Sequence, residues 1–179
     1  MFPKYDLDKI KFATDAPTFE KAVDLYEKGK VTKFEERIGV YSAVVIGTKP
    51  YRVSVEARRY DYGNCECYLG QNDTLCKHMV AVAIRAVTGG KSLSDEDKRL
   101  ISQATCSGRL GELSKGELAA AKKEISGAMK YIKPYNGPSR IWFSYQNSLQ
   151  EGCNRLSKIV SELPVSGQTA EVLVDMLLR

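Results

Sequence analysis

The chain contains little of several residue types, and each shortage excludes a class of protein. Its 179 residues include one histidine, one tryptophan and five cysteines. A framework of disulfides favours an even number of cysteines, so this odd number indicates reduced thiols and an intracellular protein. No stretch approaches the ~20 apolar residues that a bilayer span needs, which argues against a membrane protein.

The amino-terminal segment MFPKYDLDKIKF lacks the apolar run of a signal peptide. We therefore expect a cytoplasmic location, or the nucleoid or nucleus if the protein binds DNA. The net charge of +5 is too small to indicate nucleic-acid binding by itself. The distribution of charge is more informative, because the segment from Lys30 to Arg59 contains seven basic residues and only three acidic ones. This segment is predicted to be locally positive.

Residue periodicity predicts an α+β fold for the first half of the chain. A helix is expected over residues 14–29, followed by strands at 31–37, 40–46 and 51–58. In the third strand, apolar and polar residues alternate, as in an antiparallel β-meander with one solvated face. A helix over about 76–87 follows the strands, and its apolar run Met79–Ile84 is interpreted as the buried face of a short helix.

The second half of the chain is predicted to be all helical. Helices are expected to begin at Ser94 and to span residues 114–132, 139–163 and 169–178. The third of these carries a continuous apolar seam: Trp142, Tyr145, Leu149, Gly152, Leu156, Ile159 and Leu163. Packing of this seam against the last helix is favoured over a dimer interface. We expect one domain over residues 1–90 and a helical domain over 91–179.

The candidate metal-binding motif lies within the first half, between the third strand and the helix over about 76–87. Cys65-x-Cys67 is followed after eight residues by Cys76-x-His78, which is the only histidine. Residues i and i+2 share a face of an extended strand, so the first pair fits a strand end or tight turn. In a helix, the side chains of residues i and i+2 point in different directions. The second pair therefore requires Cys76 at the helix cap and His78 in the first turn.

Three sulfurs and one imidazole are the donor set of a tetrahedral zinc site. Four protein ligands leave no position for water or substrate, so a single structural Zn²⁺ is expected at Cys65, Cys67, Cys76 and His78. A catalytic Cys–His pair is disfavoured, because it needs a free imidazole and usually a third orienting group. We expect no enzymatic activity and no small-molecule substrate.

The pattern CEC…CKH followed by an apolar helix resembles the SWIM zinc finger, whose signature is C-x-C, a variable gap and C-x-H in a ββα arrangement. The preceding helix ending in YEKGKV, followed by strands, strengthens the resemblance, which covers roughly residues 17–88. By this resemblance, Cys65, Cys67, Cys76 and His78 correspond to the zinc ligands. It implies DNA binding or protein–protein contact, without an activity of its own.

Two kinds of partner therefore remain open. The first is nucleic acid, with DNA foremost, contacted by basic residues around the metal site: Arg52, Arg58, Arg59, Lys77 and Arg85. A solvated surface explains these five residues about equally well. The alternative is an adaptor or accessory subunit of a larger ATPase- or nuclease-type assembly, which would bind its protein partner through the helical half.

Overall fold

A computed structural model of the chain describes residues 2–100, 106–138 and 142–178. The chain divides into two compact units, Met1–Leu100 and Ile101–Arg179, so the division falls ten residues after the boundary expected from sequence. Within the described residues, no helix combines the length and the apolar character needed to cross a membrane.

Unit 1 is an α+β structure built on a four-stranded antiparallel sheet of order β1-β2-β3-β4. The strands are β1 (Val31–Arg37), β2 (Val40–Ile46), β3 (Pro50–Glu56) and β4 (Gly63–Cys65). Tyr41, Val53 and Val55 are buried on the inner face, whereas Arg52 and Glu56 are exposed on the outer face. The alternation predicted for the third strand is therefore confirmed, and the sheet presents one polar face.

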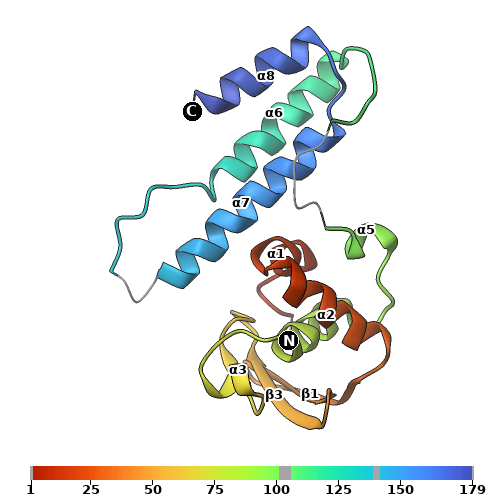
Figure 1. Cartoon of the computed structure of the whole chain (residues 1–179), viewed down its shortest axis with the longest axis vertical. Coiled ribbons are helices and arrows are strands. Elements are labelled where there is room, and N and C mark those ends of the chain that lie inside the picture. The colour runs from red at the N-terminus through yellow and green to blue at the C-terminus, as the bar shows by residue number, and fades with distance from the viewer. Residues whose placement is uncertain (1, 101–105, 139–141, 179) are drawn as a thin grey trace. The chain divides into compact units, whose positions relative to one another are not determined.

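The central element of unit 1 is α4 (Lys77–Thr88), which packs against all four strands. The helices α1 (Leu7–Ala13) and α2 (Ala16–Glu27) pack on its other side (Figure 1). The run Met79–Ile84 was interpreted as one helix face, and this interpretation is wrong. Every residue of the run is buried, because α4 is covered by the sheet on one side and by helices on the other.

Several short elements were not predicted from sequence. The expected first helix is preceded by α1, whose N-cap Asp6 accepts a hydrogen bond from the Lys9 N–H. The one-turn α3 (Tyr68–Gln71) lies in the expected loop, whereas the three-residue β4 ends at Cys65, where a strand end or a tight turn was expected. The helix expected at Ser94 is the single turn α5 (Asp95–Lys98), which belongs to unit 1 and begins with a capping box.

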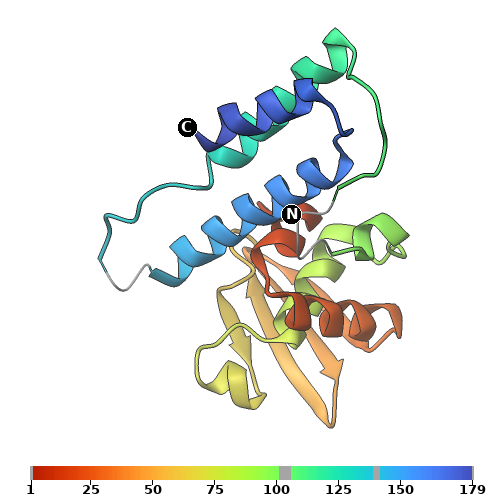
Figure 2. The ribbon, with the colours of Figure 1, turned by 45° about the horizontal axis from the view of Figure 1, so that its top comes forward.

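Unit 2 contains the helices α6 (Lys115–Met129), α7 (Trp142–Glu162) and α8 (Gly167–Leu177). The helix α6 packs on α7 and shares a small cavity with α8. It lies between these two helices in Figure 1, whereas in the turned view of Figure 2 α8 overlaps α6. The seam of α7 was expected to pack on the last helix, but α7 packs chiefly on α6. Gly152 marks the contact, because an added Cβ would lie 3.2 Å from the Ala128 carbonyl oxygen of α6 and 2.7 Å from the side chain of Ile132, which follows α6. The first three residues of the expected 139–163 helix and the side chain of Trp142 lie outside the described set.

The central position of α4 predicts a large cost for truncating its buried side chains. We expect Ile84→Ala, at a fully buried position, to lower the free energy of unfolding of the metal-loaded protein by about 2–5 kcal/mol. Ile46→Ala is the matched control, because Ile46 is 38% exposed at the end of β2 and should cost under about 1 kcal/mol. Chemical denaturation followed by circular dichroism measures both values. Equal costs for the two variants would contradict a central α4.

Candidate metal centre

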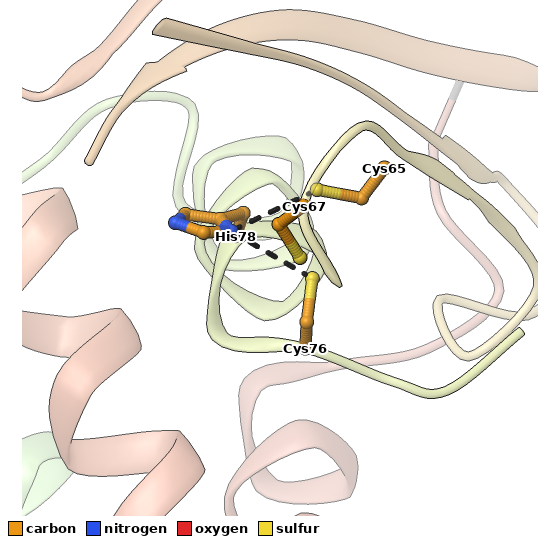
Figure 3. A group of neighbouring side chains, drawn as sticks. All are labelled: Cys65, Cys67, Cys76 and His78. Carbon is orange, nitrogen blue, oxygen red and sulfur yellow. Dashed lines mark hydrogen bonds between the residues drawn. The ribbon is translucent and has the colours of Figure 1, made fainter. Parts of the chain in front are cut away.

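Four potential metal ligands meet at the junction of β4, α3 and α4 (Figure 3). Cys65, Cys67, Cys76 and His78 are all buried, and none of them is more than 8% exposed. One donor atom from each lies within 4.8 Å of the other three. The structure therefore brings together the quartet that the sequence singles out, and this buried group could hold one metal ion.

The first pair of ligands is positioned by the edge of the sheet. Cys65 ends β4 and pairs with Val53 of β3, so its side chain points to the inner face beside α4. The ladder extends by one residue, because the Glu66 N–H donates to the Arg52 carbonyl. The Glu66 side chain in turn accepts a hydrogen bond from the Arg52 N–H at 2.9 Å. Glu66 thus holds Cys65 and Cys67 on one side of the chain.

The turn after Cys67 directs the chain toward α4. Cys67 is the N-cap of α3, and its Sγ accepts a hydrogen bond from the Gly70 N–H at 3.4 Å. A Cβ at Gly70 would lie 2.4 Å from the Cys65 carbonyl oxygen, so this close approach requires glycine. Asp73 adopts a left-handed φ of 51°, which completes the reversal.

The second pair of ligands begins the central helix. Cys76 is the N-cap of α4 and His78 lies in its first turn, which is the arrangement predicted from the i, i+2 spacing. The unpaired N–H groups and the positive end of the dipole at a helix N-terminus favour a thiolate. The same helix therefore positions two ligands at its start and supplies the core with its next six residues.

The distances fit a tetrahedral centre. The Nδ1 atom of His78 lies 3.7 Å from the Cys65 sulfur and 3.9 Å from the Cys76 sulfur, as the dashed lines of Figure 3 indicate. Tetrahedral bonds of ~2.3 Å to sulfur and ~2.0 Å to nitrogen give edges of about 3.5–3.8 Å. Since all four donors lie within 4.8 Å of one another, shifts of about an ångström or less would complete the coordination.

The sulfurs also influence one another electrostatically. The hydrogen bond from the Cys65 thiol lowers the pKa of Cys76 to about 4. The contact between Cys76 and His78 also lowers the pKa of Cys76. The same hydrogen bond, followed by burial, raises the pKa of Cys65. Without a cation, the quartet stabilises one thiolate and resists a second, because two negative sulfurs would lie side by side. A bound cation removes that repulsion, so metal binding would release protons.

The imidazole of His78 fits closely into the hairpin between β2 and β3. Its Nε2 atom is buried and has no hydrogen-bond partner among the described residues. The Tyr51 ring packs on it with centroids 4.7 Å apart. A Cβ on Gly47 would lie 2.9 Å from Nε2 and 3.0 Å from the Tyr51 ring. Gly47 and Tyr51 therefore fix the ring so that Nδ1 faces the sulfurs.

The five basic residues proposed as nucleic-acid contacts lie on different elements. Arg52 is on the outer face of β3, Arg58 and Arg59 follow β3, and Lys77 and Arg85 lie in the first and third turns of α4. Arg59 forms an ion pair with Asp61 at 2.6 Å and lies over the Tyr62 ring. Arg85 lies over the Phe34 ring, 5.7 Å from its centroid.

The outer face of the sheet carries both signs of charge. Glu35, Glu56 and Glu66 lie on the same face as Arg37 and Arg52, and Arg37 pairs with Glu35 at 2.7 Å. The positive segment expected from the sequence therefore does not produce a positive strand face. The alternation of side chains along the strands separates the cations of this segment from one another. Ion pairs with nearby carboxylates neutralise some of these cations.

A comparison with protein-family models, with curated proteins and with solved structures finds no match for this chain. The resemblance to the SWIM finger thus rests on the four ligands and their spacing. The buried quartet is compatible with a zinc finger.

Removal of one sulfur tests the quartet. We expect Cys76→Ser to abolish stoichiometric metal binding and to lower the thermal stability of unit 1, because the remaining three donors lose affinity for a divalent metal. Metal content by mass spectrometry and a chelator competition assay measure the change. Cys153→Ser is the matched control, since Cys153 is exposed on α7 and should leave one metal per chain. Full metal content in the Cys76 variant would contradict the site.

The hairpin contact gives a second prediction. Gly47→Ala should push the imidazole away from the sulfurs and weaken metal binding by roughly 10–100-fold, the range typical of groups that orient a ligand. Gly116→Ala on α6 is the control, because its added methyl group would meet no atom within 4 Å. Unchanged metal affinity in the Gly47 variant would show that this glycine does not position His78.

Proposed function

We propose that the chain is a zinc-stabilised binding module whose metal centre has no catalytic role. The observation that carries this proposal is the burial of a complete set of four donors at one point. A tetrahedral ion bound by four protein ligands has no open position for water or substrate. The centre instead ties the edge of the sheet to the start of the central helix.

The donor chemistry favours zinc as the resident ion. Three thiolates and one imidazole are soft ligands, whereas Mg²⁺ and Ca²⁺ require oxygen. Zinc has no redox chemistry and accepts the tetrahedral geometry that these spacings approach. Cys65, Cys67, Cys76 and the Nδ1 atom of His78 would hold it.

We further propose that unit 1 associates with nucleic acid, with DNA as the first ligand to test. Arg52, Arg58, Lys77 and Arg85 support this proposal, because none of them has an ion-pair partner among the described residues. The rings of Tyr62 and Tyr68 are 54% and 81% exposed, and exposed aromatic rings can stack on unpaired bases. The mixed charge of the sheet's outer face limits the number of phosphates that the protein can neutralise.

A salt titration tests this association. If four cations neutralise four phosphates, the affinity for duplex DNA should fall as salt is added. A plot of log Kd against log salt concentration should then have a slope of about 3.6. Removing two cations in Arg52→Gln/Arg58→Gln should reduce that slope by about 1.8 and weaken binding to every sequence alike. Fluorescence anisotropy of labelled single-stranded and duplex DNA, with metal-loaded protein, measures both quantities.

The control variant is Lys122→Gln/Lys123→Gln, which removes two exposed cations from α6 in unit 2. It should leave the slope unchanged, because these lysines lie outside unit 1. Absence of binding at low salt by the metal-loaded protein would refute nucleic-acid association while leaving the zinc site intact.

A further inference from the structure

The last helix of unit 2 carries two apolar stripes. Thr169 and Val172 are buried, and Val172 and Met176 line a small cavity with Ile125 of α6. This stripe, at i, i+3 and i+7, attaches α8 to unit 2. A second stripe lies on the opposite side of the helix and consists of Ala170, Val174, Leu177 and Leu178.

This second stripe is exposed. Val174, Leu177 and Leu178 are 55%, 79% and 81% accessible to solvent, although an amphipathic surface helix would place polar residues at such positions. The other exposed large apolar residues among those described in unit 2, Leu110 and Val165, pair in a bridge just before α8 begins. Exposed apolar side chains gathered on one element indicate an interaction surface rather than scattered surface residues.

The charges beside the stripe indicate what kind of partner covers it. Glu171 and Asp175 are exposed, stand one turn apart and line one edge of the stripe. Between Gly167 and Leu177 there is no basic residue. Lys122 of α6 lines the same small cavity as Asp175. A second copy of α8 would bring like charges together along this edge, so self-association is disfavoured.

We propose that the outer stripe of α8, formed by Ala170, Val174, Leu177 and Leu178 with Glu171 and Asp175 at its edge, docks an amphipathic helix of a partner protein whose apolar face is flanked by Lys or Arg. Apolar residues of the partner at i, i+3, i+4 and i+7 match the stripe, and its basic residues pair with the acidic edge. The proposal goes beyond the proposed function, because it requires neither the metal centre nor nucleic acid.

The test uses the full metal-loaded chain and two synthetic helical peptides of about 20 residues. Both peptides carry leucines at i, i+3, i+4 and i+7, flanked by lysines in one peptide and by glutamates in the other. We expect the basic peptide to bind at least about fivefold more tightly than the acidic one by isothermal titration calorimetry. Glu171→Lys/Asp175→Lys should reverse that preference. The matched control is Glu124→Lys, which changes the charge of an exposed residue on α6 and should leave the preference unchanged.

A second variant separates apolar docking from charge attraction alone. Val174→Gln/Leu177→Gln should abolish binding of the basic peptide without loss of helical content, because both positions are exposed. Equal binding of the two peptides, retained binding by this variant, or a concentration-dependent dimer in sedimentation that the variant abolishes would each overturn the proposal. The DNA titration should be unchanged in Val174→Gln/Leu177→Gln, which alters no charge, so failure of this proposal and failure of nucleic-acid association are distinguishable.

Discussion

The packing of α4 is the constraint on which the rest of unit 1 depends. Its N-cap is Cys76, its first turn supplies His78, and its next six residues are buried between the sheet and the two amino-terminal helices. The position of the helix therefore determines both the shape of the core and the distance from the imidazole to the sulfurs of β4 and α3. Structural zinc sites contribute ~10–16 kcal/mol in small peptides that have almost no core. Here the ion would strengthen a junction that hydrophobic packing already defines.

The sequence predicts the quartet well because its geometry is local. Two cysteines at i and i+2 need an extended segment, and a cysteine and a histidine at that spacing need a helix start, which β4, α3 and α4 provide. The three long strands are also predicted, because glycine-containing turns separate them, and apolar and polar residues alternate along the third. The helices α1 and α3 were missed because four to seven residues are too few to show a period, whereas β4 ends at Cys65, where a strand end or a tight turn was expected. The role of Gly47 was missed because its contact with His78 joins residues distant in sequence.

Both helical errors have one physical cause, since periodicity tells which residues are apolar but not which element covers them. Met79–Ile84 was assigned one buried face, yet it is covered on both sides. The seam of α7 was assigned to α8, yet α7 packs on α6 near Gly152. The fully buried Glu151, paired with Arg155 one turn later at 2.8 Å, also lies outside any pattern of apolar residues. Such placements are decided by tertiary packing, which a single sequence does not display.

Charge limits where a polyanion can approach unit 1. If a divalent ion is bound as proposed, three thiolates and that ion leave a net charge of about −1 at the centre, which repels phosphate at short range. The quartet lies on the inner side of the sheet, where Cys65 pairs with Val53. Arg52, the neighbour of Val53, points to the opposite face, because successive side chains of a strand alternate. A phosphate bound by Arg52 would therefore lie on the outer side of the β3–β4 edge, separated from the sulfurs by the sheet itself. At that face, the metal would act on binding only by holding the β3–β4 edge in place.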